Sequence, residues 1–203
     1  MTDESGHTLK SREAQALFRA ELQNSDSWSI QYARQYELLE RDFRIAQGIV
    51  IPPAGYHFGA VSTSYVLGSQ RPVNGRLSAE HGSFFSGDRT TVGYSGRLEF
   101  SPRFSVEPSL SQNWIDLAKG QFVTRLATAR AIFTPSPRTV LSALLQYNSS
   151  NHTWSSNVRL RWEYAPGSEL FVVYSDGRDT TGSGFPELQN RTLAMKLTYL
   201  FRF

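Results

Sequence analysis

The sequence has no cysteine among its 203 residues. This absence excludes disulfide bonds, thiolate catalysis and cysteine-ligated metal sites. It also lacks any run of the roughly 18 consecutive apolar residues that a membrane-spanning helix needs. Charged residues make up only 19% of the chain, and the arginines are scattered singly rather than grouped. We therefore expect no nucleic-acid partner, because a nucleic-acid-binding protein usually carries a basic stripe.

A secretory signal is absent from the opening stretch MTDESGHTLKSREAQ. This stretch is polar, with no basic segment followed by an apolar one, which is what defines a signal peptide. We therefore expect either a cytoplasmic protein or an N-terminus that is not the native one. We assign residues 1–12 to a polar N-terminal segment and residues 13–203 to the folded domain.

Alternation of apolar and polar residues dominates the rest of the chain. In NVRLRWEY (157–164), Val158, Leu160, Trp162 and Tyr164 alternate with Asn157, Arg159, Arg161 and Glu163. Such alternation predicts half-buried strands, and short turn signals such as SPR, TPSP and APGS separate them. The fold class is therefore an all-β antiparallel meander of about 10–12 long strands. The expected strands are 13–22, 27–38, 55–67, 75–85, 89–100, 104–115, 122–133, 139–148, 155–164, 169–175 and 190–203.

The length of these strands favours a membrane. They average about ten residues, whereas soluble strands usually run about 5–6 and tilted membrane-spanning strands about 9–11. Five aromatic residues fall near predicted strand ends, where an interfacial girdle would place them: Trp28, Tyr36, Trp114, Trp154 and Tyr164. Aromatic residues are also good strand formers in water, so a soluble ligand-binding β-barrel remains an alternative.

The longer connections fall mostly at one end of the predicted strands. Residues 39–54 and 176–189 form the longest of them, and the connections at the opposite end are mostly tight turns. Outer-membrane barrels have this asymmetry, with short periplasmic turns and longer external loops.

Several stretches carry a resemblance to a family of bacterial outer-membrane proteins of uncharacterised function. They are DFRIAQGIVIPPAGYHF (42–58), GSFFSGDR (82–89), WIDLAKGQFVTRLATARAIFTPSPR (114–138) and LLQYNSSNHTWSSNVRLRWEYAPGSELFVVYSDGRD (144–179). The family has an N-terminal domain resembling carbohydrate-binding family 9 and a C-terminal β-barrel. The resemblance implies an outer-membrane location, membrane lipid as a partner, and glycans as partners only through the missing N-terminal domain.

The closing stretch LTYLFRF resembles the C-terminal signal of bacterial outer-membrane barrels. Met195, Leu197, Tyr199, Phe201 and Phe203 alternate with Lys196, Thr198, Leu200 and Arg202. The resemblance implies the barrel-assembly machinery as a partner, with Tyr199, Phe201 and Phe203 as the assembly signal. Leu200 breaks the polarity of the second row.

The expected strand count is odd, whereas bacterial single-chain barrels usually have an even number. We therefore expect a C-terminal portion of a larger barrel, and a small closed barrel of ten or twelve strands is the alternative. Inside it we expect the lumen-facing side chains Arg159, Arg161, Glu163, Gln146, Asn148, Lys196 and Arg202. Such a row can line a hydrated pore with anion preference, or form an ion-paired network that fills the barrel.

No catalytic or cofactor-binding constellation is visible. The histidines at 7, 57, 81 and 152 lack metal-ligand spacing, and DGRDTTGSG (176–184) lacks the carboxylate ladder of a calcium loop. We therefore expect no metal, no cofactor and no catalytic residue in this chain. The sequence indicates an outer-membrane scaffold or passive pore, linked to carbohydrate binding or uptake by resemblance alone. The alternatives are a membrane-associated hydrolase with its sites outside this chain, or the soluble barrel.

Overall fold

The computed structural model describes residues 10–182 and 184–201. Their strands are β1 (Ser11–Glu21), β2 (Ser27–Leu38), β3 (Phe43–Ala46), β4 (Ile49–Ile51), β5 (Gly55–Leu67), β6 (Val73–Phe84), β7 (Gly87–Ser101), β8 (Phe104–Leu117), β9 (Gly120–Ser136), β10 (Thr139–Asn148), β11 (Thr153–Ala165), β12 (Ser168–Asp179) and β13 (Glu187–Leu197). Among these residues, no helix has the length and apolarity needed to cross a membrane.

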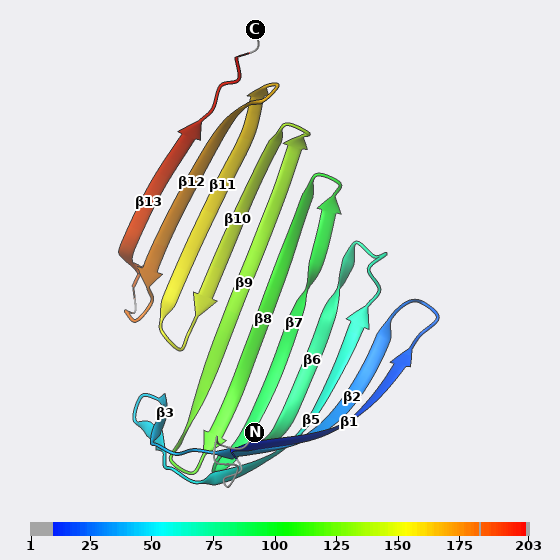
Figure 1. The fold of residues 1–203 in the computed structure, drawn as a ribbon, viewed down its shortest axis with the longest axis vertical. Helices are drawn as coiled ribbons and strands as arrows, with labels where there is room; N and C mark the ends of the chain where they lie inside the picture. The colour runs from blue at the N-terminus through cyan, green and yellow to red at the C-terminus, as the bar shows by residue number, and fades with distance from the viewer. Residues whose placement is uncertain (1–9, 183, 202–203) are drawn as a thin grey trace. The chain divides into compact units, whose positions relative to one another are not determined.

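Eleven strands form one sheet in the order β1-β2-β5-β6-β7-β8-β9-β10-β11-β12-β13. Each strand lies beside its successor in that order, as Figure 1 shows, and every register that the structure defines is antiparallel. The predicted all-β antiparallel meander is therefore confirmed. In the described residues β1 pairs only with β2 and β13 only with β12, so the sheet is not closed.

The connections alternate between the two ends of the strands. We call one end the loop end, and its connections are residues 39–54, 85–86, 118–119, 149–152 and 180–186. We call the other the turn end, and its connections are residues 22–26, 68–72, 102–103, 137–138 and 166–167. The loop end therefore has the two longest connections, as the sequence predicted, together with two-residue turns.

The chain divides into two compact units. The first comprises residues up to 68, 75–94 and 111–124, and the second comprises residues 69–74, 95–110 and those from 125 onward. The first unit contains β3 and β4, which form a separate two-stranded hairpin. The sequence predicts only a plain connection at residues 39–54, because strands of three or four residues are too short to show a period.

The closing strand is shorter than predicted. β13 ends at Leu197, and only Thr198 continues the ladder, through its N–H and C=O to Glu169 at 2.8 and 3.1 Å. β12 begins at Ser168, directly after the turn at 166–167, so Leu200 and Phe201 lie past its first residue. The expected strand 190–203 is wrong in its last part, and Arg202 and Phe203 lie outside the described residues.

Candidate functional site: the two faces of the sheet

The strand registers assign side chains to the two faces of the sheet, because directly paired residues share a face. In the first unit Phe18, Ile30 and Thr63 stand opposite one another on β1, β2 and β5. Alternate positions on the same strands place Gln15, Gln31 and Ser62 on the other side. We call the side of Phe18 and Ile30 the apolar face, and the side of Gln15 and Gln31 the polar face.

The second unit has the same two faces. On β10, β11 and β12, Leu141 stands opposite Leu160 and Leu160 opposite Val172, which continues to Met195 on β13. The alternate row pairs Ser142 with Arg159 and Arg159 with Val173. Here too one face is apolar, and the other carries most of the polar side chains.

The apolar face is exposed rather than packed. Its large side chains are exposed to a degree unusual for a core, with Phe18 57%, Leu77 50% and Met195 67% exposed. The buried apolar residues among those described are four, Ile49, Ile51, Ile115 and Leu117, and all belong to the first unit. A contiguous apolar surface of this kind normally marks contact with another apolar phase or partner.

The five aromatic residues noted in the sequence all fall on the apolar face near strand ends. Trp28 and Tyr36 are close to opposite ends of β2, and Trp154 and Tyr164 close to opposite ends of β11. Two of their polar atoms are satisfied, since Trp28 Nε1 donates to Thr63 Oγ1 at 2.9 Å and Tyr164 Oη to the Thr198 carbonyl at 2.9 Å. A polar tip on an apolar ring suits the boundary between a hydrocarbon phase and water.

The polar face of the first unit is linked by hydrogen bonds from strand to strand. Gln31 Nε2 donates to Gln15 Oε1 at 2.8 Å, and Arg89 forms a 2.7 Å ion pair with Glu80. Thr91 Oγ1 donates to Asn113 Oδ1, and Asn113 Nδ2 donates to Thr124 Oγ1, both at 2.8 Å. These bonds give the polar side chains of neighbouring strands partners on the same face.

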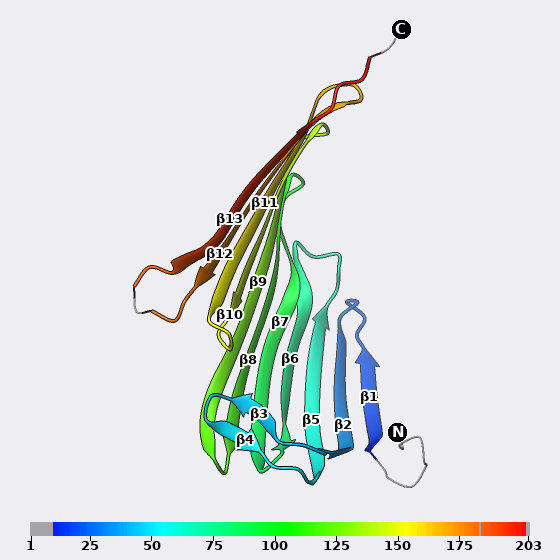
Figure 2. The ribbon, with the colours of Figure 1, turned by 60° about the vertical axis from the view of Figure 1, so that its left-hand side comes forward.

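The β3–β4 hairpin packs onto this polar face near the loop end, as Figure 2 shows. Ile49 and Ile51 bury themselves against Ile115 and Leu117, which share a face with Asn113. Lys119 Nζ also donates to the Val50 carbonyl at 2.9 Å. The hairpin therefore covers the polar face at one place and is held there by the one apolar core among the described residues.

Aromatic side chains also pack against the core that holds the hairpin. Phe84 and Phe85 are consecutive, and both pack against the core because Phe85 adopts a left-handed backbone with φ 51°. The Phe85 ring lies 5.0 Å from that of Tyr56 and 5.2 Å from that of Phe58, in edge-to-face geometry. Such contacts stabilise beyond the apolar area they bury.

The predicted lumen row of the second unit lies on one face. Arg159 pairs with Ser142, Arg161 with Val140, Gln146 with Ser155 and Asn148 with Thr153. Gln146 and Asn148 thus share the face of the arginines but stand nearer the loop end, not beside them. Lys196 joins the same face on β13, opposite Phe171, which in turn is opposite Arg161.

The charges of this row are only partly matched. Arg161 is ion-paired with Glu169, a residue that the sequence reading overlooked although the turn at 166–167 brings it opposite Glu163. Glu163 itself accepts from the Gly167 N–H at 3.0 Å and so caps the turn. Among the described residues, the Arg159 side chain donates from Nε to Asn157 Oδ1 at 2.7 Å and forms no ion pair. With neighbouring Arg130, it lines a hollow on this face that contains no carboxylate.

The residues expected to form the assembly signal lie past the end of β13. The rings of Tyr199 and Phe201 stack edge to face with centroids 4.5 Å apart and are 61% and 72% exposed. Leu200, which broke the expected pattern, turns to the β11–β12 turn. Its N–H donates to Ser168 Oγ at 3.0 Å, and its side chain covers Gly167.

Among the described residues, no group of three or more histidine or carboxylate side chains is arranged to hold a metal ion. Comparisons of the chain with models of protein families, with curated proteins and with solved structures find no match. The resemblance to the outer-membrane family therefore stays a prediction.

Proposed function

We propose that this chain forms membrane-embedded β-structure of an outer-membrane barrel, serving as a scaffold or passive pore. The observation that carries the proposal is the exposed apolar face, which runs opposite a hydrogen-bonded polar face on the same strands. In water this face would be a large uncovered apolar surface. In a bilayer it meets lipid, while the polar face lines a hydrated interior.

Strand length supports the same conclusion. The sheet strands run from 10 residues in β10 to 17 in β9, and a tilted membrane-spanning strand needs about 9–11. The aromatic residues near both ends of β2 and β11 add the expected interfacial girdles.

A pore, rather than a filled scaffold, is supported by the polar face of the second unit. Arg130 and Arg159 lie there without a carboxylate partner among the described residues. Unpaired guanidinium groups in a water-filled passage attract anions. The link to glycans rests on the sequence resemblance alone.

The test is conductance of the purified chain in planar lipid bilayers. Steady conductance with anion-over-cation selectivity, reversed by the charge change Arg130→Glu with Arg159→Glu, supports the pore. Insertion into vesicles without conductance would exclude the pore and support the scaffold. Recovery of folded chain in the aqueous fraction without detergent would favour the soluble barrel and overturn the proposal.

A further inference from the structure

Ionisable side chains on the apolar face of the first unit gather at the loop end. Along β1, β2, β5 and β6 they are Arg12, Arg34, His57 and His81, each within five residues of that end of its strand. The remaining positions of this face toward the turn end are uncharged, and include Phe18, Trp28, Ile30, Tyr65 and Leu77. The face therefore has an apolar band bordered by a basic rim.

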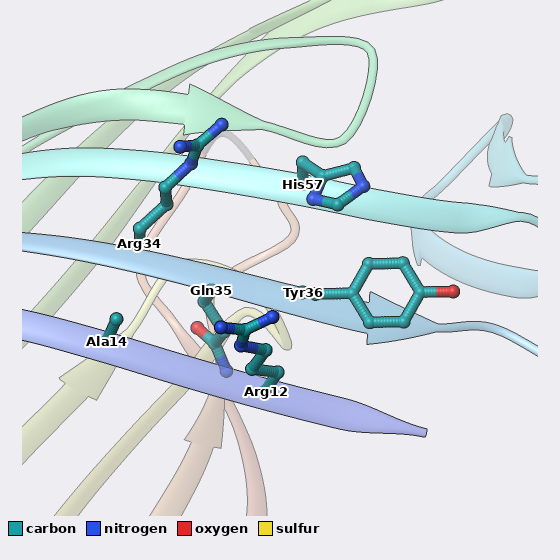
Figure 3. Close-up of a pocket in the computed structure, with 6 residues that line it drawn as sticks. All are labelled: Arg12, Ala14, Arg34, Gln35, Tyr36 and His57. Carbon is teal, nitrogen blue, oxygen red and sulfur yellow. The ribbon is translucent and has the colours of Figure 1, made fainter. Parts of the chain in front are cut away.

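Three of these side chains are neighbours of Tyr36 in the sheet. Arg12 and His57 both pair directly with Tyr36, from the two neighbouring strands, and Arg34 lies two residues before Tyr36 on β2. Figure 3 shows the three basic side chains on β1, β2 and β5, with His57 beside the tyrosine and Arg34 farther along β2. The Tyr36 and His57 rings are 4.9 Å apart, and the group lines a hollow of ≈ 550 Å³.

The positive charges of this cluster are not neutralised by the protein. Among the described residues, neither Arg12 nor Arg34 forms an ion pair or hydrogen bond through its side chain. The neighbouring Glu40 is held by Lys10 Nζ at 2.9 Å. Of the other carboxylates on this face of the unit, Asp88 and Asp116 belong to β7 and β8, with β6 between them and His57. Asp26 lies in the turn at the opposite end of β2, where it accepts from Tyr65 Oη at 2.7 Å.

In the second unit, the arginines on the apolar face are paired with a carboxylate of the protein itself. On its apolar face Asp176 is 5% exposed and forms ion pairs with Arg178 at 2.9 Å and Arg191 at 3.5 Å. In that cluster one buried carboxylate is shared by two guanidinium groups, so both arginines have a protein partner. The cluster around Tyr36 has two guanidinium groups without a paired carboxylate, so it can take an anion from outside.

We propose that Arg12, Arg34 and His57 bind the phosphate group of a membrane lipid. The inference rests on the proposed function, because it takes the apolar face as the one that meets lipid. When the apolar band lies in the hydrocarbon of the bilayer, the basic rim that borders it lies at the bilayer surface. The anions at that level are the phosphate groups of the lipids. A guanidinium group binds phosphate oxygens through two parallel hydrogen bonds, and diagonal neighbours on a sheet are close enough for long side chains to share one anion.

The experiment uses the lack of native cysteine. A fluorescent label is attached to Ala14→Cys, a position that lines the hollow, and the full chain is reconstituted in phosphatidylcholine vesicles with a minor fraction of phosphatidic acid. In one set the phosphatidic acid carries brominated, quenching acyl chains. In the other set an equal fraction of the phosphatidylcholine carries them. Insertion of each variant is checked by protease protection.

Preferential quenching by phosphatidic acid is expected, by about tenfold in relative affinity, which corresponds to ~1.4 kcal/mol. The double change Arg12→Gln and Arg34→Gln should abolish the preference, whereas Arg12→Lys with Arg34→Lys should retain part of it. The matched control Arg130→Gln with Arg159→Gln removes the same charge from the polar face and should leave the preference unchanged.

Other results would overturn the proposal in distinguishable ways. Equal quenching by both lipids means that the face meets lipid without choosing phosphate, so the proposed function stands and the lipid site falls. Loss of the preference on adding inorganic phosphate means that the cluster takes free phosphate instead. Absence of quenching by either lipid means that the face is not in the bilayer, which overturns the proposed function as well.

Discussion

Residues 160 and 161 show the two faces at the smallest scale. Leu160 pairs with Leu141 and Val172 on the apolar face, and Arg161 pairs with Val140 and Phe171 on the polar face. We expect a spin label at Leu160→Cys to relax strongly with oxygen dissolved in the bilayer, and one at Arg161→Cys to relax with a water-soluble nickel chelate. Equal relaxation at both sites, or the opposite order, would contradict the assignment of the faces.

Gly82 is a residue at which no side chain fits. It stands opposite Ala60, and an added methyl group would lie 2.5 Å from the Ala60 Cα and closer still to the Gly59 carbonyl oxygen. These are backbone atoms, so the strands themselves must separate. We expect Gly82→Ala to lower the free energy of unfolding by about 1–3 kcal/mol, as overpacking does.

Urea titration of the protein in lipid vesicles measures this loss. The matched control is Gly184→Ala in the connection between β12 and β13, where an added methyl group meets nothing within 4 Å. The control should change stability by no more than about 0.5 kcal/mol. An equal effect of the two substitutions would show that β5 and β6 are not packed this closely.

At the scale of elements, the hairpin β3–β4 sets the width of the polar space in the proposed barrel. Its attachment depends on Ile51, which is 2% exposed. Replacing it with alanine removes packed methylene groups from the core that holds the hairpin, which costs about 2–5 kcal/mol. We expect Ile51→Ala to release the hairpin, raising single-channel conductance and freeing the backbone at Arg44, whose side chain is already exposed, for cleavage by trypsin.

Val50→Ala provides the control for this experiment. Val50 is the neighbouring residue of β4 but lies outside the buried core, and its carbonyl contact with Lys119 does not involve the side chain. It should leave both conductance and cleavage near the wild-type values. Cleavage at Arg44 that is as fast in the wild type as in Ile51→Ala would show that the hairpin is not seated on the polar face.

The elements also show what the sequence could and could not predict. Strands β2, β5 and β10 have the predicted bounds, because alternation there runs unbroken between clear turn signals. The hairpin and the end of β13 were missed because their structure depends on tertiary partners. Alternation continues through Phe201, yet the backbone ladder stops at Thr198, and the Leu200 N–H turns to the Ser168 hydroxyl instead.

For the candidate site too, local alternation was predictable from the sequence and tertiary partners were not. Alternation alone placed Arg159, Arg161 and Lys196 on one face, and the registers agree. The partner Glu169 and the capping role of Glu163 depend on the exact turn at 166–167. The basic cluster around Tyr36 was invisible to sequence reasoning, because its members lie on three strands and no local pattern joins them.

At the scale of the whole molecule, the number of strands decides how the sheet can close. The eleven strands of the sheet alternate in direction, so the first and the last run the same way. In the described residues β1 and β13 each keep one edge without a paired strand. If these two edges joined, within one copy or between two copies inserted in the same direction, they would have to pair in parallel.

Parallel closure is unusual for bacterial barrels, although odd-stranded barrels exist, and unpaired strand edges are very costly in hydrocarbon. We therefore expect the 203-residue chain, refolded alone in detergent, to associate through its edges into oligomers or aggregates. Sedimentation and gel mobility with and without heating measure this. Proline substitutions at Gln15 on β1 and Leu193 on β13 remove one edge N–H each and should shift the distribution toward smaller species, whereas proline at Gly184, in a connection, should not. A monodisperse monomer whose gel mobility changes on heating would show instead that the sheet closes on itself, by the parallel seam between β1 and β13.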